Sequence, residues 1–444
     1  MAQHQDIVIV GAGIVGLCTA YYSLALSDLT RVTLVEASTE GSVAGGASSY
    51  AGGFVAGGSS WHNEPSQDLA RASFKCHVEL AKVLDGARQY GWRECGAIGL
   101  SLGHPVNRSA YRSLPGGKGK ETLEVEKGRL PPGEWVEGEK EELSLEGGVG
   151  QVDPAEFCQT LFTHLRRTYG ERFTCKFGQV TQISRGTPDK PTIAFSPHET
   201  QSREHLPFDK LVISAGPWSA QVCDLLELPA IPITNLPGHS LLIRPALDAF
   251  QPVDSKDSKK ELPSGAVFAG IDGGIAGVHG EAFGLARGLT EEEKARGYTR
   301  APEFFVRKNG LVYVAGENSI PASAHESSVG LPNKLPQYVN EVKNMVDADC
   351  AGRLKRAAGA VSPFLKEENG AVIERTQFCY RPISSDREPI VGFLERDVLV
   401  ATGHGPWGIT LAPGTGQVIA EMALGLPLSA EVSGLSPARF GIKF

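Results

Sequence analysis

Three glycines near the amino terminus stand at a spacing that suits the binding of a dinucleotide. Gly11, Gly13 and Gly16 form the pattern G-x-G-x-x-G. The first glycine permits a tight turn, the second lets the backbone approach a pyrophosphate, and the third lets a helix pack closely on a strand. Glu36 stands 20 positions after Gly16, where its carboxylate can accept hydrogen bonds from ribose hydroxyls and repel a 2′-phosphate. The pattern therefore predicts a dinucleotide site that disfavours NADP, while FAD and NAD both stay open.

Reactive side chains gather again near the carboxyl terminus. Arg381 carries a planar guanidinium that can bind a carboxylate through two hydrogen bonds, unless an acid such as Asp386 holds it in a structural ion pair. Tyr380 and Tyr313 could line a pocket or supply a hydroxyl, although aromatic side chains more often belong to the core. His404 stands among glycines and could act as an acid or base, but we give more weight to the geometry of its loop.

Three further side chains could belong either to a binding site or to ordinary structure. Trp218 and Trp407 could pack on a cofactor or a substrate, and plain core packing is at least as common. His239 is either a pocket residue or a hairpin residue, and we favour the hairpin.

Other function classes lack their patterns in this sequence. The chain of 444 residues has a net charge of −8, which argues against nucleic-acid binding and polybasic membrane binding. Its eight cysteines are scattered singly, and neither C-x-x-C nor H-E-x-x-H occurs, so we expect no metal site. No apolar run is long enough to span a membrane, and the amino terminus lacks the features of a secretory signal. We therefore expect a cytoplasmic protein.

The predicted elements explain how the glycine-rich turn is positioned. A β-branched run at Asp6–Val10 predicts a buried parallel strand, Leu17–Leu26 a helix, and Arg31–Val35 a second strand that leads into Glu36. A strand, turn and helix in this order present free backbone N–H groups and the positive end of the helix dipole to a phosphate.

Blocks spread along the whole chain resemble the FAD enzymes that oxidise amino acids. This superfamily includes D-amino-acid oxidase, glycine oxidase, D-amino-acid dehydrogenase and sarcosine oxidase. The similar blocks are AGGASSYAGG at 44–53, GQVDP at 150–154, LVISAGPW at 211–218, CYRP at 379–382, DREPIVG at 386–392 and ATGHG at 401–405.

The resemblance implies FAD as the cofactor and a C–N bond as the reacting group. In the family, hydride passes from the carbon that bears the amine to flavin N5, while the protein orients the substrate. The residues that the resemblance and the glycine motif place at FAD are Gly11, Gly13, Ile14, Val15, Gly16, Glu36, Ala37, Ser48, Ser49, Gly52, Gly53, Val180, Ala215, Gly216, Trp218, Cys379, Gly403, His404, Gly405, Trp407, Gly408, Ile409 and Thr410.

The resemblance also implies roles for single residues. Arg381 matches the family's carboxylate-binding arginine, with Tyr380 and His404 as the other catalytic candidates. Cys379 is placed like the flavin-linking cysteine of sarcosine and fructosyl-amino-acid oxidases, the alternative being a small buried thiol. The loop that contains His404 would lie at the pyrimidine edge of the flavin, where the dipole of a helix predicted at Leu411–Leu424 favours negative charge.

The expected fold is α/β, with a Rossmann-like FAD-binding domain and an α+β substrate domain built on a mostly antiparallel sheet. We expect the FAD-binding domain to comprise residues 1–61, 150–232 and 378–444, and the substrate domain to comprise 62–149 and 233–377. Short alternating runs predict strands at Gly238–Arg244, Gly265–Ile271 and Phe304–Ala315, and a helix is predicted at Gln337–Cys350.

The sequence thus predicts an oxidoreductase that oxidises a small amino acid or amine, with oxygen as the expected electron acceptor. A quinone or carrier protein as acceptor stays open. The chain departs from the monomeric sarcosine oxidases in one respect, since Val312–Asn318 lacks the oxygen-activating lysine that they place nearby. The rival functions are the oxidation of a larger secondary amine and a non-catalytic role in trafficking or assembly. We expect no nucleic-acid partner, and the oligomeric state stays open.

Overall fold

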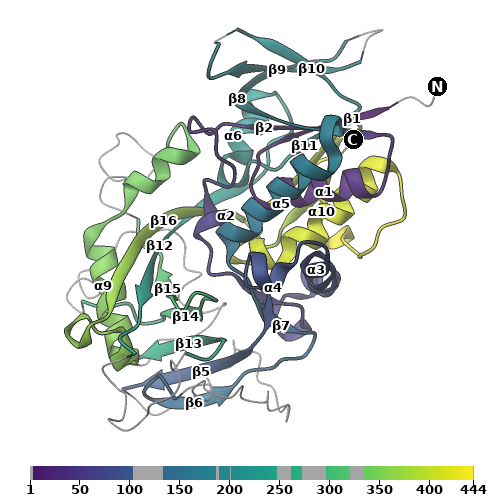
Figure 1. The fold of residues 1–444 in the computed structure, drawn as a ribbon. Helices are drawn as coiled ribbons and strands as arrows, with labels where there is room; N and C mark the ends of the chain where they lie inside the picture. Colours follow the sequence, from purple (N-terminus) through teal and green to yellow (C-terminus); the bar gives the residue numbers. More distant parts are fainter. Residues whose placement is uncertain are drawn as a thin grey trace.

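The computed structural model describes residues 4–103, 134–186, 190–200, 202–247, 262–272, 297–320 and 335–443. Within these ranges the strands form an eight-stranded, a seven-stranded and a three-stranded sheet (Figure 1). The eight-stranded sheet has the order β10-β9-β8-β2-β1-β11-β18-β17. Its strands are β1 (Gln5–Val10), β2 (Thr30–Glu36), β8 (Phe173–Ser184), β9 (Thr192–Pro197), β10 (Glu204–Pro207), β11 (Lys210–Ile213), β17 (Ile390–Glu395) and β18 (Val398–Thr402).

The centre of the eight-stranded sheet is parallel and buried on both faces. Strands β8, β2, β1, β11 and β18 run in the same direction, so their carboxyl ends lie along one edge of the sheet. The helices packed beside them include α1 (Ile14–Ala25), α5 (Pro154–Tyr169) and α10 (Gly408–Leu424), which together with the strands enclose a large apolar core. The near-continuous apolar residues of β1 and β18 follow from this two-sided burial.

The seven-stranded sheet is antiparallel except for the pairing of β13 with β5. Its order is β16-β12-β15-β14-β13-β5-β6. The strands are β5 (Gly96–Leu102), β6 (Glu139–Glu142), β12 (Ile233–Arg244), β13 (Gly265–Ile271), β14 (Glu303–Val306), β15 (Val312–Glu317) and β16 (Val372–Ser384). Helix α9 (Ala348–Val361) packs on one face through Leu354, Ala357 and Val361. The expected α/β class with a second, mostly antiparallel sheet is confirmed.

The helix predicted at Gln337–Cys350 is wrong. A 3₁₀ helix, η7, covers Val339–Met345, and α9 begins separately at Ala348. The break is explained by Asp347, whose Oδ1 accepts hydrogen bonds from the backbone N–H groups of Asp349 and Cys350 as the N-cap of α9.

One predicted domain boundary falls inside a strand, and one helix packs against an element of the other predicted domain. The boundary at residue 378 falls inside β16, which stays in the seven-stranded sheet as far as Ser384. Helix α3 (Glu64–Val83), which was expected in the substrate domain, packs against α10, with His77 Nε2 2.9 Å from the carbonyl of Ile409. The three-stranded sheet, formed by β3 (Phe54–Ala56), β7 (Val149–Gln151) and β4 (Arg93–Glu94), lies near the join between the two larger sheets.

The described residues offer neither a membrane-spanning helix nor a cluster of metal ligands. None of their helices is long and apolar enough to cross a membrane. They also contain no group of three or more histidine, cysteine, aspartate or glutamate side chains that could hold a metal ion.

Candidate functional site

A cavity of about 560 Å³ runs from the carboxyl edge of the parallel strands to one face of the seven-stranded sheet. At the first end it is lined by the segments that follow β1, β2, β11 and β18. Ligands of open α/β sheets bind at this edge, because the turns between strands and helices expose backbone N–H groups there. At the other end it is lined by side chains of β13, β14, β15 and β16.

The turn after β1 has the geometry that its glycines predict. Gly11 has a φ of +103°, and a Cβ there would lie 2.5 Å from the backbone oxygen of Ser214. A Cβ at Gly16 would lie 2.0 Å from the oxygen of Gly11, so this glycine lets α1 pack against the turn. Gly13 lines the cavity, and the backbone N–H of Ile14 donates to Ser48 Oγ at 3.0 Å. The turn and the loop at Ser48 are therefore held together at the start of α1.

Glu36 ends β2 and lines the same part of the cavity. Its carboxylate is buried and accepts hydrogen bonds from the backbone N–H groups of Ala12 at 2.7 Å and Ser38 at 3.1 Å. Burial raises the pKa of Glu36, and these N–H groups act against that rise. The carboxylate thereby fixes the glycine-rich turn to the end of the second strand. Each of its oxygens retains a lone pair that a hydroxyl can use.

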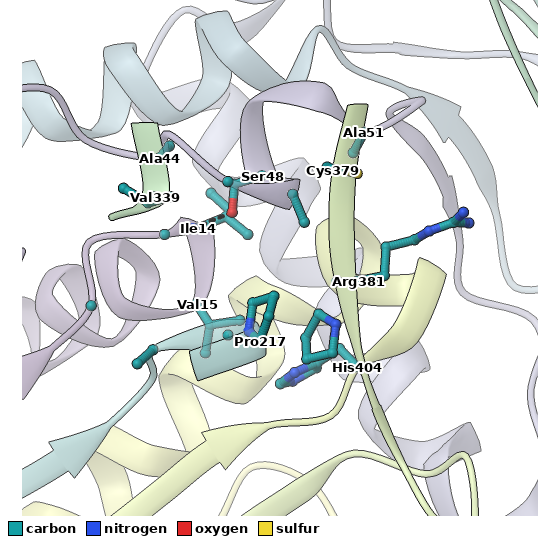
Figure 2. A pocket seen from close by; sticks show the side chains of 18 of the residues that line it. Ile14, Val15, Ala44, Ser48, Ala51, Pro217, Val339, Cys379, Arg381 and His404 are labelled. Carbon is teal, nitrogen blue, oxygen red and sulfur yellow. Dashed lines mark hydrogen bonds between the residues drawn. The ribbon is translucent and has the colours of Figure 1, made fainter. Parts of the chain in front are cut away.

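Strand β16 presents alternate side chains to the cavity. Cys379 and Arg381 line it, and Figure 2 shows them on the same strand with Ala51 beside Cys379. Tyr380 lies between them in sequence and is 1 % exposed, packed edge-on against Phe378 with the ring centroids 4.9 Å apart. The expected pocket role of Tyr380 is therefore wrong, because strand alternation turns its ring to the opposite face.

Arg381 extends from β16 across the neighbouring strand β12. Its Nη2 donates to the carbonyl of Pro237 at 3.1 Å and to the side-chain oxygen of Asn318, which follows β15. Asp386 does not pair with it, because that carboxylate accepts hydrogen bonds from Arg439 instead, one of them 2.6 Å from Nε. The guanidinium is thus oriented by two uncharged oxygens and keeps donors for a ligand.

Two buried histidines reach the cavity as neutral rings. His404 lines it and makes a 3.0 Å hydrogen bond between Nε2 and Thr415 Oγ1, and burial lowers its pKa to about 4. His239 lines it as well, which corrects the expectation of a plain hairpin residue. Its Nε2 accepts from the backbone N–H of Asp347 at 3.1 Å, and burial lowers its pKa to about 4. A neutral ring at pH 7 argues against an acid–base role for His404 as imidazolium.

An aromatic wall closes the part of the cavity near Arg381. It consists of Phe54, Phe268, Phe305 and Tyr313. The ring of Phe305 stacks on Phe54 at 5.7 Å and on Tyr313 at 5.9 Å between centroids. The hydroxyl of Tyr313 donates to the carbonyl of Tyr50 at 2.9 Å, and burial raises its pKa to about 12. Tyr313 thus lines the pocket as a neutral ring whose hydroxyl already has an acceptor.

Glu303 is a charged cavity residue that the sequence did not point to. It begins β14, lines the cavity and is half-buried, and its enclosure raises the pKa of its carboxyl to about 7 while Arg381 acts to lower it. The only signal in the sequence is a single acid at the start of an aromatic strand, Glu303–Val306, which does not distinguish a site residue from a strand end.

Most of the other predicted residues line the cavity. Those that do so are Gly11, Gly13, Ile14, Val15, Glu36, Ala37, Ser48, Gly52, Gly53, Val180, Ala215, Gly216, Trp218, Cys379, Arg381, His404, Gly405, Trp407, Gly408 and Ile409. Those that do not are Gly16, Ser49, Gly403, Thr410 and Tyr380. Thr410 instead donates from its hydroxyl to the carbonyl of Phe54 at 3.0 Å, behind the cavity wall.

Comparison with known proteins matches nearly the whole chain to one family. Residues 6–422 match the family model DAO, described as FAD dependent oxidoreductase. A Schizosaccharomyces pombe protein named "Putative oxidoreductase C1F5.03c" is 26 % identical over 462 residues, which cover 98 % of this chain and 99 % of that protein.

Solved structures agree in fold. Glycine oxidase from Geobacillus kaustophilus superposes with a TM-score of 0.66 at 18 % identity and covers 98 % of both chains. Iminodiacetate oxidase from Chelativorans sp. BNC1 has a TM-score of 0.62 at 18 % identity, covering 97 % of this chain and 98 % of its own. At these identities the similarity shows the fold.

Proposed function

The chain belongs to the family of FAD dependent oxidoreductases, and from this premise we propose that it oxidises the C–N bond of a small amino acid or amine that carries a carboxylate. The observation that carries this proposal is the guanidinium of Arg381, which lies in the cavity without a carboxylate partner among the described residues. Glycine oxidase and iminodiacetate oxidase, whose fold this chain shares, are named for substrates that combine an amine with a carboxylate.

The geometry of the cavity fits FAD. The pyrophosphate would lie at Gly11–Val15, where φ and close contacts exclude a side chain at Gly11 and the start of α1 offers backbone N–H groups. Glu36 would accept hydrogen bonds from the adenosine ribose. The flavin ring would lie between β16 and the loop before α10. The amino-terminal end of helix α10 favours negative charge there.

When bound, the flavin would accept the hydride, and with it the two electrons, that the substrate gives up. The side chains of this protein supply orientation and exclude water. Arg381 would hold the substrate carboxylate through two N–H groups, which fixes the carbon that bears the amine relative to the ring. The aromatic wall at Phe54, Phe305 and Tyr313 would exclude water from that carbon.

We also propose that Cys379 stands where it can form a thioether with the flavin. Its side chain lines the cavity, is 6 % exposed and has Ala51 beside it (Figure 2). Burial raises the pKa of this thiol, so an unlinked Cys379 would be a neutral, unreactive group. Acid precipitation of the purified protein separates the cases. Colour that stays in the pellet, and is lost from it in Cys379→Ser, shows the link, and colour in the supernatant excludes it.

Oxygen is the electron acceptor that we propose. Reoxidation of the reduced protein in air-saturated buffer, with formation of one hydrogen peroxide per flavin, would support an oxidase. Reoxidation by a quinone analogue that is at least 100-fold faster than by air would instead show a dehydrogenase.

The proposed activity is tested by the visible spectrum of the purified protein without oxygen. It is mixed in turn with D-amino acids, glycine derivatives, carboxylated secondary amines and larger secondary amines. Bleaching of the flavin band by a small carboxylated amine supports the proposal. Bleaching by larger amines alone, or persistent colour with every compound while dithionite still bleaches it, would overturn the proposal.

A further inference from the structure

We propose that Glu303 receives the ammonium group of a zwitterionic substrate whose carboxylate is held by Arg381, and that it removes one proton from that ammonium. This inference rests on the proposed oxidation of a carboxylated amine. It adds a base to the proposed site, and it predicts that the site selects substrates that carry both a carboxylate and an ammonium group.

Strand geometry directs Glu303 to the cavity. Within β14, Glu303 and Phe305 line the cavity, whereas Phe304 between them is fully buried in the core on the other face. On the strands at each side, Glu303 is paired with Ala315 of β15 and with Phe268 of β13, and both of these residues also line the cavity. A carboxylate therefore stands among apolar side chains on the same sheet face as Arg381.

The two charged groups are separated by about one strand. Although Arg381 starts on β16, its side chain crosses Gly238 of β12 and its Nη2 contacts Asn318, just beyond the end of β15. Glu303 is on β14, the next strand after β15, and neighbouring strands lie roughly 4.8 Å apart. An α-amino acid carries its carboxylate and its amine on one carbon, so a single small molecule can contact both side chains.

Apart from Arg381, no ionisable group of the described residues that line this cavity carries a positive charge that could compensate Glu303. Burial lowers the pKa of His239 and His404 to about 4, and it raises the pKa of Tyr313 to about 12 and that of Cys379 above its usual value. Among the described residues, Arg381 is the one cation that lowers the pKa of Glu303, and none of them forms a hydrogen bond with this carboxyl. A half-buried carboxylate without a donor is costly unless a ligand supplies one.

The chemical step is a proton transfer that needs no further reactant. One N–H bond of the substrate ammonium breaks, and an O–H bond forms on the Glu303 carboxylate. The electron pair of the broken bond stays on nitrogen, which gives the neutral amine whose C–N bond can be oxidised. Neither group changes oxidation state, and Glu303 returns its proton to solvent when the product leaves. Because burial raises the pKa of Glu303 to about 7, the carboxyl can accept this proton near neutral pH.

The first test follows flavin reduction by the best amino-acid substrate from pH 5 to pH 10 in stopped flow. In the wild type we expect the second-order rate constant to fall about tenfold per pH unit below pH 7, as Glu303 takes up a proton. In Glu303→Gln this limb should shift up to the pKa of the substrate amine itself, because no side chain then removes the proton, so the variant should be slower by about 100-fold at pH 8. Glu303→Asp should restore the limb in part.

The matched control is Glu141→Gln, which removes an exposed carboxylate from edge strand β6 of the same sheet and should match the wild type. An acid limb that is the same in the wild type and in Glu303→Gln would overturn the inference. If no compound reduces the flavin of the wild type, the proposed function has failed. The binding test below then decides whether Arg381 and Glu303 form a paired site.

The second test measures binding without turnover, using acetate as a carboxylate that lacks an amine. Above pH 7 the ionised Glu303 should repel it, so its Kd from the flavin spectrum should rise at least about tenfold between pH 6 and pH 9. In Glu303→Gln the Kd should stay constant. A constant Kd in the wild type, or the absence of acetate binding at every pH, would contradict a paired site of Arg381 and Glu303.

Discussion

At the scale of single residues, the position of Arg381 depends on the absence of a side chain at Gly238. A Cβ at Gly238 would lie 2.2 Å from Nη2 of Arg381, so Gly238→Ala should push the guanidinium away from Asn318. Because the clash is with the end of a flexible side chain, the fold should survive. We expect KM for the amino-acid substrate to rise by about tenfold or more, with little change in the urea midpoint. An unchanged KM would show that the guanidinium of Arg381 binds the substrate without having to pass over Gly238.

Residue roles were predictable only where backbone geometry or a motif dictates them. The glycine pattern indicates the turn at Gly11 because steric contact leaves no other residue type there. Tyr380 was predicted to belong to the site together with its neighbour Arg381. Adjacent residues of a strand face opposite sides, and the sequence alone did not show which of the two faces the cavity. Glu303 was missed because its significance depends on Arg381, which is brought near it only by the sheet order.

At the scale of elements, the turn between β1 and α1 carries a testable steric requirement. Gly11→Ala adds a methyl group 2.5 Å from the oxygen of Ser214 at a φ of +103°, which forces β1 and β11 apart where the cofactor would lie. We expect a loss of roughly 1–3 kcal/mol in unfolding free energy together with loss of bound flavin.

Gly41→Ala is the matched control for this variant. Gly41 also has a positive φ, +64°, but a Cβ there would meet no atom within 4 Å. This control should cost at most about 1 kcal/mol and retain its flavin. Equal flavin content and equal urea midpoints in the two variants would contradict the steric account of the turn.

The strand, turn and helix at the amino terminus could be predicted from the sequence, whereas the break inside the helix predicted at 337–350 could not. Strands β1 and β2 agree to within one residue at each end with the predicted ranges, Asp6–Val10 and Arg31–Val35. The agreement is close because buried parallel strands leave a clear apolar pattern in the sequence. Across 337–350 the periodicity suggests one helix, but the side-chain cap supplied by Asp347 begins α9 anew and leaves a 3₁₀ helix before it.

At the scale of the whole molecule, buried ionisable groups make folding sensitive to acid. His77, His239 and His404 have pKa values lowered to about 4 by burial, against an ordinary value near 6.5. Unfolding below pH 6.5 therefore takes up protons at these three rings and favours the unfolded chain. Glu303 and Glu36, whose pKa values are raised by burial, act in the opposite direction.

The balance leaves at least one net proton taken up on unfolding. Stability should be nearly constant between about pH 6.5 and pH 8 and fall by roughly 1.4 kcal/mol per pH unit or more as the pH drops from 6.5 towards 4. Urea unfolding at a series of pH values measures this slope. Glu303→Gln removes an opposing group and should steepen it, so a slope that is flat in the wild type and unchanged in the variant would contradict the assignment.

The site as a whole combines segments that are distant in the sequence. The cavity takes its walls from the ends of parallel strands on one side and from β13–β16 on the other. The blocks that resemble the family predicted that the glycine-rich turn and residues 379–381 serve one site, but none of these blocks lies in β13, β14 or β15. The aromatic wall was not predicted, because Phe54, Phe268 and Phe305 meet only through tertiary packing.

We attribute substrate selection to the recognition of a carboxylate by Arg381, and a paired comparison of two amines measures this recognition. Anaerobic flavin reduction is measured with a carboxylated amine and with the same amine lacking the carboxylate, for example N-methylglycine and dimethylamine. The wild type should be reduced at least about 100-fold faster by the carboxylated member, since a bidentate charged pair contributes roughly 3 kcal/mol. Arg381→Gln should abolish this preference and Arg381→Lys should keep part of it. An equal preference in the wild type and in Arg381→Gln would contradict the account.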